Sequence, residues 1–183
     1  MMNSVNGEMN AVTVGCMAIG PEHRVLDIGF GGGVALGLMA QAAARGTVVG
    51  VEMSPTMLAQ ARRSCRVLLE EGRLHLVGGV AEQLPFADAC FDRICTVNTV
   101  YFWKDAPGAA REVWRVLKPG GTFVLSFRPA KDMHTLPFTR YGFTLYDREA
   151  IGRLLKDAGF GQIHFREQRD AHLRFACAMA GKD

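Results

Sequence analysis

Apolar runs of strand length alternate with longer segments of helical period along this chain, and this alternation limits the fold more than any other feature of the sequence. The first two runs, Arg24–Ile28 and Thr47–Glu52, flank a helical segment at Val34–Arg45. A strand, a helix and a further strand in that order form a βαβ unit, whose two strands lie parallel in one sheet. The sequence therefore predicts an α/β protein with a mostly parallel sheet.

The same alternation continues through the remaining sequence. Ser54 and Pro55 start a second helix, as N-cap and first-turn proline, which ends at Gly72. A third helix is expected from Asp105 to the "KPGG" sequence, and a fourth at Asp147–Phe160. The further strands are expected at Arg73–Val77, Phe91–Asn98, Thr122–Phe127, Gly161–Gln168 and His172–Ala180. A short "RDA" turn separates the last two, so the predicted fold is a doubly wound, Rossmann-like sheet of seven strands with an antiparallel C-terminal hairpin.

The composition fits one soluble globular domain. Of the 183 residues, 49% are hydrophobic and 21% are charged, which is ordinary for a domain with one core. We expect a single domain over residues 1–183, with residues 1–20 as a short N-terminal extension. The sequence shows no signal peptide and no stretch of roughly 18 apolar residues, so we expect a cytoplasmic location and no membrane span. A net charge of +3 is too small to indicate nucleic-acid binding by itself.

The five cysteines do not form a recognisable pattern. Cys16, Cys65, Cys90, Cys95 and Cys177 are odd in number and scattered, with no C-x-x-C and no paired histidine spacing. Neither a disulfide framework nor a metal site is indicated. We expect reduced and mostly buried thiols.

The segment "DIGFGGGV" after the first strand places an acid directly ahead of a cluster of glycines. A dinucleotide-binding loop follows the pattern G-x-G-x-x-G or A. Counted from Gly29, this chain has Gly31 at the second position and Val34 at the third, so the match is partial. Asp27 weakens it further, because a carboxylate beside the N-terminus of the next helix repels a pyrophosphate.

A cationic cofactor without phosphate suits this loop better. S-adenosylmethionine joins an adenosine to a sulfonium and an ammonium group, both of which favour a nearby carboxylate. Glu52 ends the second strand, about 20 residues beyond the glycines, where an acid hydrogen-bonds ribose hydroxyls in either class of cofactor. Glu52 thus indicates an adenosine, and Asp27 favours S-adenosylmethionine over a nicotinamide dinucleotide.

With these residues the chain resembles the class I S-adenosylmethionine-dependent methyltransferases, and within them the small type 11 or ubiquinone-biosynthesis-like group. "VLDIGFGGG" is similar to the family's first motif and "GVEMSPTMLAQAR" to its ribose-binding segment. "AEQLPFADACFDRI" is similar to its adenine loop and fourth strand, and "EVWRVLKPGGTFVLSF" to its closing helix and fifth strand. The likeness covers nearly the whole chain, and four motifs in order are a stronger signal than the glycine loop alone.

The resemblance implies which residues bind the cofactor. It places Asp27 near the methionine amino group, Met53 against the adenine, the Ala81 amide on the ring and Asn98 near the methionyl end. The residues expected to bind the cofactor are Asp27, Gly29, Phe30, Gly31, Glu52, Met53, Val80, Ala81, Glu82 and Asn98. Family members often carry an Asp where this chain has Val80, so either Glu82 or Gln83 substitutes for it or that contact with the adenine is absent.

Several of these residues have a structural alternative. Asp27 could bond backbone amides at the end of its strand, although both roles can coexist. Glu52 could be a solvated strand end, and Met53 could fill the core.

The methyl acceptor is expected beside the segments that follow the fourth and fifth strands, because ligands of open α/β sheets bind beyond the carboxyl ends of the strands. Tyr101 and Trp103 are expected to shape an aromatic substrate pocket, and Arg128 to bind substrate. His134 and Tyr101 are the candidate catalytic residues, since a histidine side chain can serve as a base for an acceptor that must lose a proton.

Three functional classes are compatible with the sequence. A methyltransferase acting on an unidentified small-molecule acceptor is favoured. An NAD-dependent oxidoreductase and a non-catalytic domain that binds S-adenosylmethionine are the alternatives. The segments that usually cover the substrate are short, so we expect an open pocket or one closed by a partner subunit in a homodimer.

Overall fold

A seven-stranded sheet forms the centre of the molecule in the computed structural model, which describes residues 7–134, 139, 142 and 144–183. The strands are β1 (Arg24–Ile28), β2 (Thr47–Glu52), β3 (Leu74–Gly78), β4 (Phe91–Val97), β5 (Leu117–Phe127), β6 (Gly161–Arg169) and β7 (Arg174–Gly181). They lie in the order β3-β2-β1-β4-β5-β7-β6. β7 pairs antiparallel with β5 and β6, and the other neighbours pair parallel. The predicted fold class is confirmed.

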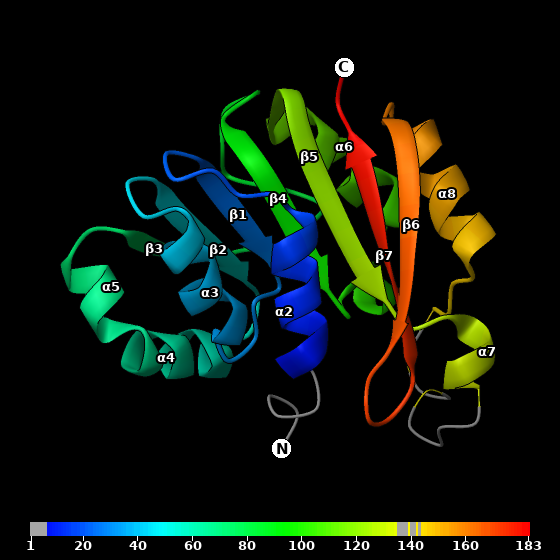
Figure 1. Ribbon diagram of the computed structural model, residues 1–183, viewed down its shortest axis with the longest axis horizontal. Coiled ribbons are helices and arrows are strands. Elements are labelled where there is room, and N and C mark those ends of the chain that lie inside the picture. Colours follow the sequence, from blue (N-terminus) through cyan, green and yellow to red (C-terminus); the bar gives the residue numbers. More distant parts are fainter. Residues whose placement is uncertain (1–6, 135–138, 140–141, 143) are drawn as a thin grey trace.

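Helices cover both faces of this sheet (Figure 1). They are α2 (Gly7–Cys16), α3 (Val34–Ala42), α4 (Pro55–Ser64), α5 (Arg66–Glu70), α6 (Ala106–Val116), α7 (Ala130–Met133) and α8 (Arg148–Asp157), with a short 3-10 helix η1 (Val100–Phe102). One core joins α2, α3 and α4 to one face of the sheet, and a second core joins α6 and α8 to the other. Side chains alternate between the faces along each strand, so Leu26 and Ile28 enter the α6 side and Val25 enters the α2 side.

The chain runs outward from β1 through β2 to β3 and then returns to β4, on the other side of β1. Loops that leave the carboxyl ends of β1 and β4 therefore diverge in opposite directions. A crevice opens at such a switch point, and ligands of open α/β sheets bind there. The topology alone thus places the expected site above β1 and β4.

The structure differs from the prediction at three elements. The expected N-terminal extension contains α2, whose buried Met9 and Thr13 pack onto the sheet. The expected helix ending at Gly72 is divided at Cys65 into α4 and α5. The "KPGG" sequence forms a bulge inside β5, because Leu117 already pairs with Phe91 before the regular ladder resumes at Thr122.

The described residues show neither a helix with the length and hydropathy needed to cross a bilayer nor a cluster of His, Cys, Asp or Glu side chains arranged for a metal ion. All five cysteines are free thiols, and Cys65, Cys95 and Cys177 are buried.

Candidate active site

A cavity of about 930 Å³ lies at the carboxyl ends of β1, β2 and β4. Its wall is built by the loops that follow these strands and β3, by the first residues of α3 and α4, and by one residue of α2. Binding sites for drug-sized ligands and cofactors measure about 300–1,000 Å³. The cavity has room for a nucleoside-sized cofactor together with part of a second molecule.

The glycine loop between β1 and α3 forms one side of the cavity. Gly29 and Gly31 have left-handed backbone angles, with φ of +74° and +55°. A Cβ on Gly29 would approach the Thr99 methyl group to 2.5 Å, whereas a Cβ on Gly31 would meet no atom within 4 Å. Gly29 is therefore required for packing against the β4 loop, and Gly31 leaves its backbone open to a ligand.

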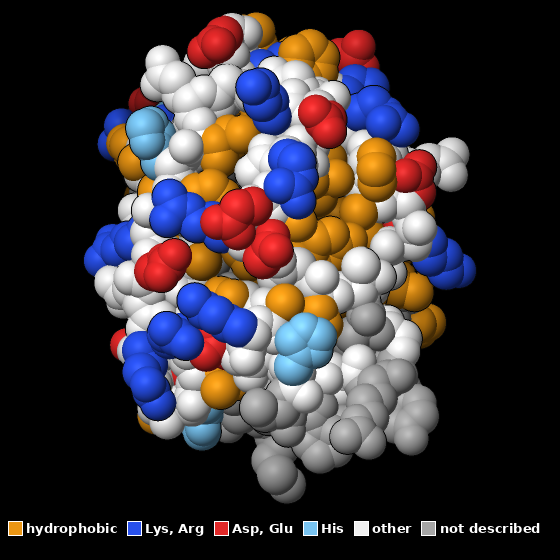
Figure 2. Space-filling view, turned by 90° about the vertical axis from the view of Figure 1, so that its right-hand side faces the viewer, with side chains coloured by type: hydrophobic (Ala, Val, Ile, Leu, Met, Phe, Trp, Pro, Cys, Tyr) orange, Lys and Arg blue, Asp and Glu red, His pale blue; other side chains and the backbone are white. Residues whose placement is uncertain are grey.

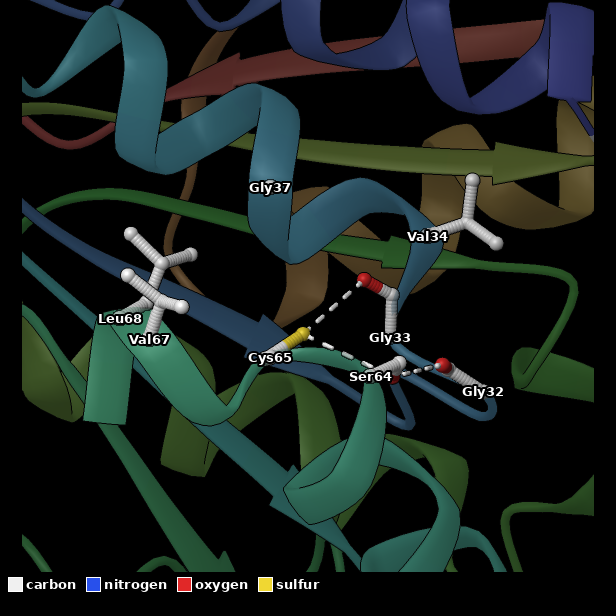
Figure 3. Close-up of a pocket in the computed structure, with 8 residues that line it drawn as sticks. All are labelled: Gly32, Gly33, Val34, Gly37, Ser64, Cys65, Val67 and Leu68. Carbon is white, nitrogen blue, oxygen red and sulfur yellow. Dashed lines mark hydrogen bonds between the residues drawn. The ribbon is translucent and has the colours of Figure 1, made fainter. Parts of the chain in front are cut away.

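The division between α4 and α5 supports this loop from behind (Figure 3). The Ser64 hydroxyl donates to the Gly32 carbonyl at 3.4 Å, and the Cys65 thiol donates to the Gly33 carbonyl at 3.9 Å. A smaller cavity of about 260 Å³ lies between α3 and this break and is lined largely by apolar side chains.

Asp27 is a buried carboxyl group on the floor of the large cavity, with 2% of its surface exposed. Within the described chain, its recorded hydrogen bond comes from the Cys95 thiol, at 3.5 Å. The pKa of this carboxyl is raised from 3.8 to about 7, because burial and, to a lesser extent, the charge of Glu52 raise it by more than the Cys95 hydrogen bond lowers it. An ionised Asp27 is thus poorly solvated, and a cation at this point would stabilise it.

Glu52 is also buried and connects β2 to the glycine loop. Its Oε2 accepts from the Gly31 amide at 3.0 Å, and its Oε1 accepts from the Ser54 amide at 2.9 Å. Each carboxylate oxygen keeps a second lone pair for a hydroxyl donor. A pyrophosphate docked on the loop would compete with this carboxylate for the Gly31 amide, so the site favours a ligand with hydroxyl groups over one with phosphates.

Met53 and Val80 present apolar surface at the mouth of the cavity, with Met53 66% exposed. Met53 therefore does not fill the core. Of the two residues expected to replace the missing acid at position 80, Glu82 lines the cavity, whereas Gln83 is exposed and does not line it. Glu82 Oε1 accepts from the Lys104 amide at 2.7 Å, which fixes the side chain at the rim.

Asn98 directly follows β4, has a left-handed conformation and lines the cavity. Its Nδ2 donates to the Met9 sulfur at 3.3 Å, and its Oδ1 accepts from the Tyr101 hydroxyl at 3.2 Å. Side chains from α2 and η1 thus hold this amide in place. All ten residues expected to bind the cofactor line this one cavity.

The structure requires a correction on the acceptor side. The Tyr101 side chain is 3% exposed and lies in the core on the α6 face, where its hydroxyl accepts from the Arg128 amide at 2.5 Å. Burial raises the pKa of this phenol. Arg128 is buried too and pairs with Asp170 at 2.6 Å. Neither side chain lines the cavity, so neither is placed to touch a ligand there, and the predicted roles of Tyr101 in catalysis and of both residues in substrate binding are withdrawn.

The two remaining acceptor-side candidates have different positions. Trp103 lines the cavity, although most of its surface packs in the core. His134 is exposed at the end of α7 and does not belong to the cavity wall. This position gives no support to the prediction that His134 is catalytic.

The residues of the cavity wall that the sequence interpretation missed include Asn10, Met57, Gln60 and Lys104. Met57 and Gln60 are three positions apart on α4, and this spacing could have indicated a shared face. No sequence pattern indicated that Asn10 of α2 or Lys104 after η1 lines the cavity. For Asn10, nothing in the sequence shows that α2 folds over the carboxyl ends of the strands.

Several known proteins are similar to this chain in sequence or in fold. The chain matches the methyltransferase domain family over residues 26–125. An uncharacterized methyltransferase of Synechocystis sp. is 32% identical over 178 residues, which cover 91% of this chain and 80% of that protein. A chain in the complex of the Haloferax volcanii Trm112 methyltransferase activator with a putative methyltransferase has a TM-score of 0.84 at 18% identity, covering 98% of this chain and 91% of that one. A geranyl diphosphate methyltransferase in complex with S-adenosylmethionine has a TM-score of 0.81 at 14% identity, covering 99% and 87%.

The strand order, with a cavity at the carboxyl ends of β1 and β4, is that of a class I methyltransferase, and the two solved structures share this fold. The sequence match is more specific. The chain belongs to the methyltransferase domain family, and it is an S-adenosylmethionine-dependent methyltransferase. None of these similarities supports the oxidoreductase alternative.

Proposed function

We propose that the cavity holds S-adenosylmethionine between Asp27 and Val80 and that the protein transfers the methyl group to a small-molecule acceptor. The observation that carries this proposal is the pairing of a buried, poorly solvated carboxyl at Asp27 with the second buried carboxylate at Glu52. Asp27 would receive the ammonium group of the cofactor. Glu52 would accept from the ribose hydroxyls while it keeps its bonds to Gly31 and Ser54.

The remaining contacts follow from the cavity wall. Met53 and Val80 would offer apolar surface to the adenine ring, and the Ala81 amide would bond the edge of the ring. Val80 cannot accept a hydrogen bond from the exocyclic amine, so Glu82 is the acid left for that task on this side of the cavity. Gly31, with open space in its Cβ direction, lets the cofactor approach the backbone.

The acceptor would bind at the end of the cavity formed by Asn10, Asn98, Phe102 and Trp103. When bound, the cofactor supplies a methyl carbon already activated by its sulfonium. The protein therefore contributes mainly by positioning: α2 and η1 fix the Asn98 amide, and the Phe102 ring, which is 53% exposed, provides an apolar surface beside it.

The surface charges and the free thiols support proposals about the partners and the location of the protein. On the face shown in Figure 2, Lys and Arg side chains are interspersed with Asp and Glu. Ion pairs such as Arg148–Glu167 and Arg174–Asp132 join charges of opposite sign in this protein. Such a mixed distribution of charge does not favour the binding of nucleic acid.

Five free thiols suit a reducing compartment, so we propose that the protein is located in the cytoplasm. The homodimer stays a prediction.

Calorimetric titration tests the cofactor site. The wild-type protein should bind S-adenosylmethionine and its demethylated product but not NAD. Asp27→Asn and Glu52→Gln should each weaken the binding by about 1–3 kcal/mol, the range for losing a charged hydrogen bond. Normal affinity in both variants would refute the assignment of this cavity.

A metabolite extract incubated with methyl-labelled cofactor tests catalysis separately. A labelled product that forms with wild-type protein and not with Asp27→Asn would support transfer to a small molecule. Tight cofactor binding with no labelled product from any extract would favour the non-catalytic alternative.

A further inference from the structure

Cys95 lies beside Asp27 in the sheet. The parallel register of β1 and β4 pairs the two residues directly, and both side chains point to the α2 face. Cys95 is completely buried, and its thiol donates to Asp27 Oδ1 at 3.5 Å. The cofactor chemistry proposed above gives this thiol no role, because it does not line the cavity.

We propose that Cys95 is a positioning residue, which orients the Asp27 carboxylate towards the cavity and favours its ionised form for the ammonium group of the cofactor. This inference rests on the proposed role of Asp27. It deepens that role, since it names the group that makes the buried carboxyl usable near neutral pH.

The surroundings of Asp27 offer few other ways to stabilise its negative charge. From β2, Glu52 adds a second negative charge, which opposes ionisation. From α2 and α3, the cavity wall receives Asn10, Val34 and Ala35, none of which titrates. On the described part of the chain, the Cys95 thiol is thus the group recorded as lowering the pKa of Asp27.

The thiol is suited to this position because it stays protonated. Burial raises the pKa of Cys95 well above its ordinary value, and the charge of Asp27 raises it further. A neutral thiol can donate its proton to the carboxylate without adding charge to the core. On the same face, Cys177 of β7 interacts with Ser126 at 3.1 Å and has no recorded hydrogen bond to Asp27.

The test is the pH dependence of S-adenosylmethionine affinity, measured by calorimetry between about pH 5.5 and pH 8.5. The variants are Cys95→Ala and Cys95→Val, which remove the donor, and Cys95→Ser, which keeps one. Cys95→Val also fills the space that alanine would leave empty, in case the alanine variant does not fold. Cys177→Ala is the matched control, because it truncates an equally buried cysteine on the same face.

Loss of the donor should raise the pH midpoint of binding by about half a unit to one unit, which makes binding about three- to tenfold weaker at pH 6. Affinity at the upper end of the pH range should stay within about twofold. Cys95→Ser and Cys177→Ala should keep the wild-type midpoint. The α-amino group of the cofactor titrates near pH 7.7–8.0 in every sample, so the comparison between variants removes its effect.

An unchanged midpoint in both donorless variants would overturn the inference while leaving the cofactor site intact. An equal shift in Cys177→Ala would also overturn it, since the effect would then come from packing. The Asp27→Asn variant separates a failure of the proposed role of Asp27 from a failure of the inference about Cys95. If this variant binds the cofactor as tightly as the wild-type protein at every pH, the proposed role of Asp27 fails, and the inference about Cys95 fails with it.

Discussion

Gly31 combines a left-handed backbone with a Cβ direction that meets no protein atom. Gly120, in the β5 bulge, has the same two properties, with φ of +73°, but lies at the opposite end of the sheet. A side chain strains either position by about 1–2 kcal/mol. The two glycines therefore allow backbone strain to be separated from contact with a ligand.

Gly31→Ala should abolish or strongly weaken S-adenosylmethionine binding, because the new methyl group occupies the space that the ligand needs. Gly120→Ala should lose about the same unfolding free energy, about 1–2 kcal/mol, and bind normally. Calorimetry and urea denaturation of both variants check this. Equal affinities in the two variants would show that Gly31 does not face the cofactor.

At the scale of elements, the turn from β4 through η1 connects the cavity to the core. Asn98 faces the cavity, while Tyr101 three residues later points into the core and bonds to both Asn98 and the backbone of Arg128. Arg128 directly follows β5 and pairs with Asp170, which accepts from the His172 and Leu173 amides in the β6–β7 turn. The hairpin and the cavity wall are thus joined by one chain of buried polar contacts.

Tyr101→Phe should remain folded but lose about 1–3 kcal/mol of unfolding free energy, because the buried Arg128 amide loses its acceptor. Tyr101→Ala should lose about 3–5 kcal/mol through the cavity that it creates. Denaturant unfolding measures both values. If both variants had wild-type stability, the buried position of Tyr101 would be wrong, and direct contact with substrate would again be open.

The Arg128–Asp170 pair should make the protein acid-sensitive. Burial opposes ionisation of Asp170, but hydrogen bonds from Arg128, Leu173 and His172 hold its pKa at about 2, below 3.8. Its stabilising contribution is full above about pH 4 and is lost as the pH falls towards 2. Arg128→Met should cost about 3–5 kcal/mol at neutral pH, because it leaves a buried charge without its partner. Thermal unfolding from acid to neutral pH should show a smaller acid-induced loss in Arg128→Met than in the wild-type protein.

At the scale of the whole molecule, Asp27 has the opposite pH dependence. Its pKa is raised from 3.8 to about 7, so its contribution to stability is full below about pH 4 and is lost as the pH rises through 7. A cofactor that pairs with the ionised carboxylate removes part of this loss. We expect S-adenosylmethionine to raise the melting temperature more at about pH 7.5 than at about pH 5.5.

Thermal unfolding with and without cofactor at the two pH values checks this expectation, with Asp27→Asn as the control. Without cofactor, the asparagine variant should match or exceed the wild-type protein in stability at the higher pH, since it carries no buried charge. If S-adenosylmethionine raises the melting temperature of the wild-type protein equally at both pH values, cofactor binding is not coupled to the ionisation of Asp27.

Much of the architecture was predictable from the sequence, because hydrophobic period and turn residues act locally. They predicted the succession of all seven strands along the chain and the antiparallel pairing of the last two, and the positions of Asp27 and Glu52 near strand ends led to one cavity. The orientation of Tyr101 was not predictable, since successive aromatic residues in a short 3-10 turn point in different directions. The packing of α2 depends on contacts with distant strands, and no local pattern shows it.

Helix α2 also has a consequence for how the molecule is made. Its Thr13 bonds to Ser126, 113 positions later, and Met9 contacts Asn98, 89 positions later. Contacts of such long range form late, because closing a long loop costs entropy before any contact is gained. During synthesis, these two contacts of α2 cannot form until β4 and β5 have left the ribosome. A nascent chain that already carries the complete glycine loop therefore has no finished active site.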